Sequence, residues 1–211
     1  MLTVRDITCE RGHRPLFAPA SFALSPGQAL HLQGDNGVGK TTLLRVICGL
    51  SPAHSGTVLW QGQPIQKAPE NYRRALFHLG HALGLKEELT ALENLRADAA
   101  VAGRALSDAQ ALQALHALGL RGREHLPVRV MSQGQKRRVA LARLRVSQAP
   151  LWVLDEPLVA LDARAVAHLR AMLGAHVAAG GLLLLTSHQP VALRIEDRDV
   201  DMATYRLEMA A

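Results

Sequence analysis

The residues best suited to chemistry in this chain lie at positions 34–41, in the run Gly34-Asp35-Asn36-Gly37-Val38-Gly39-Lys40-Thr41. This run fits the pattern G-x-x-x-x-G-K-[ST], which binds phosphate when it joins a strand to a helix. An expected strand at 29–33 precedes it and an expected helix at 41–50 follows it, so both conditions are met. The glycines let backbone N–H groups turn inward around phosphate oxygens, and the helix presents its positive end to the same anion.

The side chains of this loop predict ATP and Mg²⁺ as its ligands. Lys40 is expected to reach the β- and γ-phosphates, Thr41 to ligate Mg²⁺ through its hydroxyl, and Thr42 to contact the α-phosphate. The remaining phosphate contacts are expected from four residues of the loop: Gly34, Asn36, Gly37 and Gly39. A glycine-rich turn with a solvated lysine is the competing interpretation, and the motifs further along the chain argue against it.

A phosphate loop needs a carboxylate that holds the metal ion, and the segment 151–156 supplies one. Four apolar residues at 151–154 predict a buried strand, and Asp155 and Glu156 follow at its end. Asp155 is expected to hold Mg²⁺ through its coordination shell. Glu156 places a second carboxylate at the same strand end, where it can polarise the water that attacks the γ-phosphate. Many strands end in acidic residues, so this pattern depends on the phosphate loop for its meaning.

A third run, Met131-Ser132-Gln133-Gly134-Gln135, opens an expected helix that leads to the acidic strand end. With the order of motifs along the chain, it resembles the Leu-Ser-Gly-Gly-Gln signature of the ABC ATPases, departing from it at Met131 and Gln133. A Ser-x-Gly-Gln run alone is also compatible with a plain helix cap. The resemblance implies that Ser132, Gly134 and Gln135 contact the γ-phosphate of a nucleotide on a second ATP-binding subunit, so that hydrolysis requires a head-to-tail pair, expected to be a homodimer.

Two further segments resemble motifs of the same family. Leu161-Asp162 resembles the D-loop that crosses between the two sites of such a pair. Ser187-His188 resembles the switch histidine, and it follows the apolar strand expected at 182–186. The resemblance implies that His188 senses the γ-phosphate, although a lone histidine at such a position is more often structural.

Two positions depart from the family pattern. His81 stands where the family's Q-loop usually has glutamine, and the resemblance leaves two interpretations open. Its imidazole can still bind a metal-bound water, or it is a purely structural histidine. Arg11 falls where an aromatic residue usually stacks on adenine. Either its planar guanidinium lies across the base or the stacking is absent.

Within the ABC ATPases, the chain most resembles the ATP-binding subunit of the haem export system for cytochrome c biogenesis. Three stretches carry the resemblance, at 81–95, 132–144 and 186–190. It implies a bacterial protein on the cytoplasmic face of the inner membrane, bound to polytopic membrane subunits. In that family, ATP hydrolysis is associated with haem delivery to the periplasm or with release of a haem-loaded chaperone.

Two other functions share the same catalytic motifs, because motifs determine the chemistry and not the cargo. The first is the ATPase of another ABC exporter, for lipid, peptide or drug. The second is a soluble ABC ATPase acting on ribosomes or DNA. Proteins of the second kind generally carry two cassettes or long coiled-coil insertions, and this chain shows neither.

The elements that must position these residues indicate an α/β fold. Alternation of apolar and polar residues predicts strands at 2–8, 20–24, 29–33 and 56–60, and the segment 90–120 has helical spacing. Further on, we expect helices at 134–147 and 163–178, strands at 151–154 and 182–186, and a final strand within 195–211. The resulting fold is a P-loop NTPase of ABC type, with a mixed sheet core, an antiparallel β region and a helical subdomain at about 82–146 of one domain, 1–211.

Composition excludes several classes of protein. The longest apolar stretch, at 177–185, is far shorter than the roughly 18 residues that cross a bilayer, so we expect no membrane span. Charges near the N-terminus interrupt any signal sequence, and we expect the chain to stay in the cytosol. Cys9 and Cys48 lack metal-binding spacing and are expected to be reduced and packed. The net charge of +6 would suit nucleic acid, but 3% aromatic residues supply a poor stacking platform, so no nucleic acid partner is expected.

Overall fold

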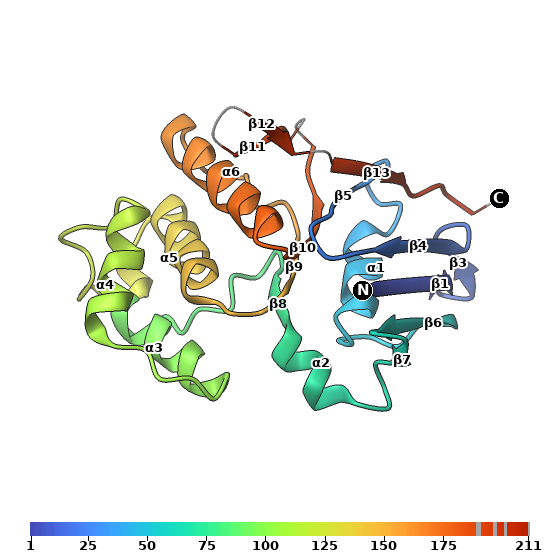
Figure 1. The fold of residues 1–211 in the computed structure, drawn as a ribbon, viewed down its shortest axis with the longest axis horizontal. Coiled ribbons are helices and arrows are strands. Elements are labelled where there is room, and N and C mark those ends of the chain that lie inside the picture. The colour runs from blue at the N-terminus through green and yellow to red at the C-terminus, as the bar shows by residue number, and fades with distance from the viewer. Residues whose placement is uncertain (189–190, 196–197, 201, 211) are drawn as a thin grey trace. The chain divides into compact units, whose positions relative to one another are not determined.

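The computed structural model describes the chain except for residues 189–190, 196–197, 201 and 211 (Figure 1). Gln189 and Pro190, which belong to the last stretch of family resemblance, therefore lie outside the described residues. The chain divides into two compact units. The first comprises Met1–His78, Ala149–Pro157 and Leu173–Ala211, and the second comprises Leu79–Gln148 and Leu158–Met172. The segment 82–146, where a helical subdomain is expected, falls within the longer stretch of the second unit.

An antiparallel sheet with strand order β4-β1-β6-β7 forms one part of the first unit (Figure 1). Its strands are β1 (Leu2–Thr8), β4 (Ala20–Leu24), β6 (Ser55–Trp60) and β7 (Gln63–Pro64). Val4 of β1 lies opposite Phe22 of β4 and Val58 of β6. Leu2 and Val4 are buried and the intervening Thr3 is partly exposed, as the alternation in the sequence predicts.

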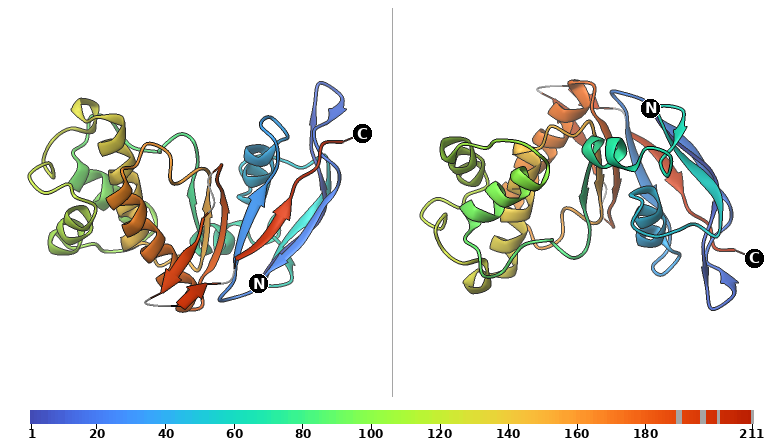
Figure 2. Two further views of the ribbon diagram at one scale, coloured as in Figure 1. Left: turned by 90° about the horizontal axis from the view of Figure 1, so that it is seen from above. Right: turned by 90° about the horizontal axis from the view of Figure 1, so that it is seen from below.

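A five-stranded sheet with order β13-β5-β10-β9-β8 holds the site. Its strands are β5 (Ala29–Gln33), β8 (Leu76–Leu79), β9 (Leu151–Leu154), β10 (Leu182–Thr186) and β13 (Met202–Arg206). Strand β5 runs parallel to both β10 and β13, and β10 runs parallel to β9; Figure 2 shows β13, in red, beside the blue β5. Every residue of β9 and β10 is buried, which confirms the prediction of a sheet covered on both faces.

Helix α1 (Lys40–Ile47) follows β5 and packs its apolar face into the core of the first unit through Leu43, Leu44, Val46 and Ile47. It ends earlier than the expected residue 50, because Gly49 adopts a left-handed φ of 68° and its N–H turns back to the carbonyl of Val46. The other small elements of this unit are α2 (Pro69–Ala75) and two hairpins, β2 (Glu10–Arg11) with β3 (Arg14–Pro15) and β11 (Leu193–Ile195) with β12 (Arg198–Val200).

The second unit is helical. It contains α3 (Ala91–Val101), α4 (Asp108–Ala117), the 3-10 turn η1 (Val128–Val130), α5 (Gln133–Val146) and the first part of α6 (Ala163–Ala178), which continues into the first unit. Helices α3, α4 and α5 pack on one another around Leu95, Leu115 and Leu141, none of which is exposed (Figure 1). Each of the three begins with a capping box that satisfies its first backbone N–H groups.

Most elements expected from the sequence are confirmed, including β1, β4, β5, β9, β10, α5 and α6. The segment 61–89 had no predicted structure and contains β7, α2 and β8. Both cysteines, Cys9 and Cys48, are buried and free, as expected. Within the described part of the chain, no helix combines the length and the apolar character that a membrane crossing requires.

Candidate nucleotide-binding site

The phosphate loop joins β5 to α1, and its backbone requires glycine. Gly34, Gly37 and Gly39 have φ values of 150°, 82° and 110°, in the region that side chains disfavour. At Gly39 an added Cβ would lie 2.7 Å from Cδ1 of Phe17, a buried ring of the core. The three glycines therefore shape the loop through backbone conformation. Gly34 and Gly39 are restricted by space as well, since an added Cβ at Gly34 would lie 2.8 Å from the carbonyl oxygen of Leu207.

The start of α1 leaves its backbone amides available to an anion. Its N-cap, Gly39, makes no side-chain hydrogen bond to the helix, and no acidic residue stands in the first turn. Nζ of Lys40 donates to the carbonyls of Gly34, at 2.7 Å, and Asp35, at 3.1 Å, so the ammonium group lies over the loop. Open amides, the positive helix end and this ammonium form a site for phosphate groups.

The acidic residues after β9 lie beside this loop. Asp155 is 5% exposed, and its two oxygens accept different hydroxyls. Oγ1 of Thr41 donates to Oδ2 at 2.7 Å, and Oγ1 of Thr186 donates to Oδ1 at 2.7 Å. The structure thus brings together Thr41 and Asp155, the two residues expected to hold Mg²⁺.

Glu156 has a backbone φ of 49°, a left-handed conformation that is uncommon for a residue with a Cβ. Its N–H donates to Oγ1 of Thr186 at 2.9 Å. Its carboxylate faces His188, because the backbone N–H of His188 donates to Oε2 at 3.2 Å and His188 Nε2 lies 3.5 Å from Oε1. The Glu156 side chain is 22% exposed and that of His188 is 57% exposed, so solvent reaches the pair.

A cavity of about 260 Å³ joins these groups. Its lining residues come from the phosphate loop, the start of α1, the acidic strand end, the switch segment and the β2–β3 hairpin: Arg11, Leu16, Asn36, Gly37, Gly39, Lys40, Thr41, Thr42, Asp155, Glu156 and His188. Arg11 is exposed at the cavity wall, where a guanidinium can lie across a planar base.

The oxygen donors at this cavity suit Mg²⁺. Asp155 and Thr41 offer a carboxylate and a hydroxyl, which are hard ligands of the kind that Mg²⁺ prefers. Among the residues that the structure describes, no cluster of three or more His, Cys, Asp or Glu side chains could hold a metal ion. In nucleotide sites Mg²⁺ commonly takes one or two protein carboxylates, together with substrate phosphates and water.

The signature residues lie in the second unit at the start of α5. Ser132 is the N-cap: its Oγ accepts from the N–H of Gln135 at 3.3 Å, and Oε1 of Gln135 accepts from the N–H of Ser132 at 3.0 Å. An added Cβ at Gly134 would lie 3.2 Å from the carbonyl of Ala160, so the D-loop approaches the helix start closely. Asp162 pairs with Arg138 of α5, and the pKa of its carboxyl is lowered, first by the N–H of Ala165 and then by Arg138.

His81 is an exposed residue of the second unit, just after β8. Both interpretations from the sequence, a contact to metal-bound water or a structural histidine, stay predictions.

The sequence did not single out three polar residues that support the site: Thr186, His31 and Gln33. His31 is 4% exposed in β5; its Nε2 donates to the carbonyl of Ser187 at 3.0 Å, and Nε2 of Gln33 donates to its Nδ1 at 3.1 Å. A neutral ring satisfies both contacts, since a carbonyl can only accept. The signal that could have identified them is a polar residue within an otherwise apolar strand.

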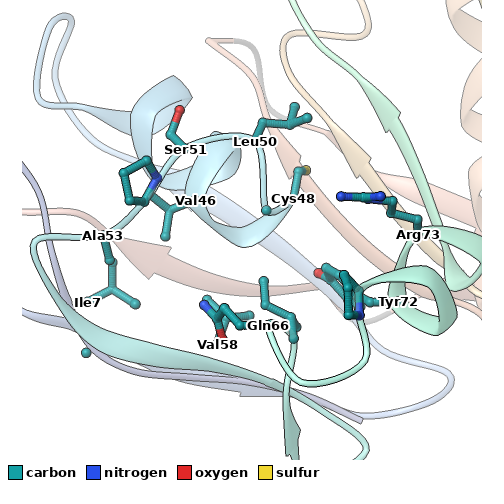
Figure 3. Close-up of a pocket in the computed structure, with 15 residues that line it drawn as sticks. Ile7, Val46, Cys48, Leu50, Ser51, Ala53, Val58, Gln66, Tyr72 and Arg73 are labelled. Carbon is teal, nitrogen blue, oxygen red and sulfur yellow. The ribbon is translucent and has the colours of Figure 1, made fainter.

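A larger cavity, about 470 Å³, lies at the other end of α1 (Figure 3). Val46, Val58 and Ile65 give it apolar walls, and Arg73 lies at its edge. Cys48 also lines it, but burial raises the pKa of this thiol, and the Asp155 carboxylate raises it further. A buried thiol with a raised pKa is inert, and no residue of the phosphate loop reaches this cavity.

Comparison with known proteins gives consistent matches. The ABC transporter family model matches residues 17–159. The cytochrome c biogenesis ATP-binding export protein CcmA of Nitrosomonas europaea is 48% identical over 193 residues, which are 92% of this chain and 91% of that protein. Among solved structures, the ATP-binding subunit of an ABC transporter has a TM-score of 0.80 at 29% identity, covering 89% of this chain and 79% of that one. A dimeric ATP-binding cassette in a post-hydrolysis state, bound to ADP and Pi, also has a TM-score of 0.80, at 23% identity, covering 90% and 88%.

Proposed function

This chain belongs to the ABC transporter family, in the branch of the cytochrome c biogenesis ATP-binding export proteins, and we propose that it hydrolyses ATP to drive a haem export complex. The observation that carries the proposal is the 48% identity across 92% of the chain to a cytochrome c biogenesis ATP-binding export protein. The chemistry is supported by the grouping of Lys40, Thr41, Asp155, Glu156 and His188 around one cavity.

The phosphate loop binds the triphosphate of ATP. When ATP binds, the Lys40 side chain moves so that its ammonium group leaves the loop carbonyls and contacts the β- and γ-phosphates. The backbone amides at the start of α1 donate to the phosphate oxygens. Asn36 and Thr42 line the same cavity and add polar contacts, while Arg11 covers the base. Thr41 and Asp155 would hold Mg²⁺, which when bound would offset the negative charge of the phosphates.

Glu156 acts as the general base. Its carboxylate lies at the cavity, is only partly exposed and is held by the N–H of His188, so it can accept a proton from a water beside the γ-phosphate. His188 then contributes its imidazole as the sensor of the γ-phosphate. His81 is proposed to contact metal-bound water, as glutamine does in the family pattern.

Two copies of the chain are proposed to close head to tail on two ATP molecules. Ser132, Gly134 and Gln135 of one copy complete the γ-phosphate site of the other. The dimeric relative bound to ADP and Pi supports this arrangement, since it has the same fold over 90% of this chain. Closure would move polytopic membrane subunits, with the chain attached at the cytoplasmic face of the bacterial inner membrane.

The test is Glu156→Gln. In the purified complex it should lower ATP turnover by about 10²-fold or more, because the general base is lost, while ATP binding is retained. Cells whose only copy carries the substitution should lack haem-staining c-type cytochromes. Glu10→Gln is the matched control, since Glu10 pairs with His54 on an exposed part of the first unit.

The two readouts separate the two parts of the proposal. Turnover of Glu156→Gln at the wild-type rate would exclude the catalytic role of this carboxylate. Loss of ATP turnover with normal c-type cytochromes would support the assignment as an ATPase and would contradict the role in haem export.

A further inference from the structure

We propose that Thr186 is a positioning residue that sets both members of the acidic pair, Asp155 and Glu156. Thr186 ends β10, and its side chain is wholly buried. Strand β10 is otherwise four leucines, so this hydroxyl is the polar group of an apolar strand. A buried hydroxyl is costly unless it is hydrogen-bonded, and here both of its bonds go to the catalytic segment.

The strand register explains how one residue reaches both carboxylate residues. In the parallel pair of β10 and β9, Leu185 lies opposite Leu154, which brings Thr186 beside the first residue after β9. Its Oγ1 donates to Oδ1 of Asp155 at 2.7 Å. The same oxygen accepts the backbone N–H of Glu156 at 2.9 Å. The single proton of the hydroxyl is thereby used on Asp155, and a lone pair is used on Glu156.

The contact to Asp155 orients its carboxylate. With Oδ1 held by Thr186, the other oxygen, Oδ2, is the one that accepts the hydroxyl of Thr41 at 2.7 Å. Without the Thr186 hydroxyl, the carboxylate can rotate about its χ2 angle, which is a broad torsion. The oxygen presented to Mg²⁺ would then no longer be fixed.

The contact to Glu156 restrains a strained backbone. A φ of 49° is unfavourable for glutamate, and it persists only where surrounding contacts maintain it. The bond from the Glu156 N–H to Thr186 is one such contact. If it is lost, the backbone can relax and carry the carboxylate away from its contact with the N–H of His188, which follows Thr186 by two residues.

This inference rests on the proposed ATP hydrolysis, and the chain offers a matched pair of variants. Thr186→Val keeps the side-chain volume and removes the hydroxyl, whereas Thr186→Ser keeps the hydroxyl and removes a methyl group. Misplacement of reacting groups by about 1 Å costs on the order of 10²-fold in rate, so Thr186→Val should lower kcat by about 10- to 100-fold. Thr186→Ser should stay within about threefold of wild type, because both hydrogen bonds can form.

The measurements are kcat and KM for ATP, the free Mg²⁺ concentration giving half-maximal turnover, nucleotide binding by fluorescence, and Tm. For Thr186→Val we expect lower kcat, a higher Mg²⁺ requirement, and ATP binding without Mg²⁺ within about threefold of wild type, since the phosphate loop is unchanged. If Thr186→Val fails to fold, Thr186→Cys replaces it, because a thiol fills similar space with much weaker hydrogen bonds.

Two results would overturn the proposal. Wild-type kcat and Mg²⁺ requirement in Thr186→Val, or in Thr186→Cys where that variant replaces it, would show that the hydroxyl does not position the pair. A loss in Thr186→Ser as large as in Thr186→Val would show that Thr186 acts through packing alone. Failure of the wild-type protein to hydrolyse ATP would instead contradict the proposed function, so the two failures are distinguishable.

Discussion

Two helix starts in this protein are built in opposite ways, although both are proposed to meet a γ-phosphate. At α1, in the first unit, the N-cap is a glycine with no side-chain hydrogen bond to the helix. At α5, in the second unit, Ser132 and Gln135 form a complete capping box. The first start leaves backbone amides for a ligand, and the second satisfies two of them from within the chain.

This difference indicates two kinds of phosphate contact. At α1 the backbone itself can bind the phosphates, with Lys40 supplying the charge. At α5 the hydroxyl of Ser132 accepts the N–H of Gln135, but that bond uses a lone pair and not the hydroxyl proton. Ser132 can therefore cap its own helix and donate to a phosphate at the same time, so the two interpretations of this residue from the sequence are compatible.

The largest expected effect comes from replacing a glycine at each helix start, because the two replacements should impair different steps. Gly39→Ala should lower ATP affinity by about 10²-fold, because the new Cβ would meet the Phe17 ring at 2.7 Å and the left-handed φ of 110° disfavours alanine. Gly134→Ala should leave ATP binding by the single subunit unchanged and lower turnover of the pair. Its Cβ would approach only the carbonyl of Ala160, at 3.2 Å. Fluorescent nucleotide titration and steady-state turnover measure the two effects.

The control for this prediction is Gly62→Ala, in the turn between β6 and β7. Gly62 also has a left-handed φ, 82°, but nothing lies within 4 Å of an added Cβ. It should lose some stability and retain ATP affinity. Equal loss of affinity in Gly62→Ala and Gly39→Ala would mean that backbone strain in general, and not the loop itself, controls nucleotide binding.

A second prediction asks whether Ser132 does more than cap α5. Aspartate is as good an N-cap as serine, so the free energy of unfolding of Ser132→Asp should lie within about 0.5 kcal/mol of the wild-type value. Its charge would repel a γ-phosphate, and turnover should fall by roughly 10-fold or more. Ser132→Asn keeps the cap without the charge, and Ser132→Ala should lose about 1 kcal/mol of stability. The measurements are ATP turnover and an unfolding curve for each variant. Wild-type turnover in Ser132→Asp would show that Ser132 only caps α5 and does not contact the γ-phosphate.

Sequence reasoning was most successful where the geometry depends on local residue types. The phosphate loop is recognisable because its backbone needs glycine at fixed positions, and Asp155 and Glu156 because they end an apolar strand. The role of Thr186 depends on which strands are neighbours and on their register, across 31 positions of the chain. Helix α2 was missed because its seven residues are mostly polar and show no clear periodicity. Strand β8 was missed because four residues, Leu76–Leu79, are few for an alternating pattern to be recognised.

A final prediction concerns stability in the second unit, where a carboxylate has a structural role in contrast to Glu156. Glu124 is buried in the loop after α4 and pairs with His116, near the end of that helix. Its own backbone N–H, that of Gly122, and His116 lower the pKa of the Glu124 carboxyl to about 2. Because this pKa lies below its ordinary value, the ionised group stabilises the fold above about pH 4.5, and the contribution is lost as the pH falls toward 2.

Glu124→Gln should therefore lower the free energy of unfolding by about 1–2 kcal/mol at pH 7, and its difference from wild type should shrink as the pH falls below 4.5. Urea titrations followed by far-UV circular dichroism at pH 7 and pH 3.5 measure this, because the helices of the second unit dominate that signal. Trp60 and Trp152 both lie in the first unit, so their fluorescence follows the part that holds the nucleotide. A difference that stays constant with pH would mean that Glu124 stabilises the loop by shape and hydrogen bonding alone, and that its charge has no part in it.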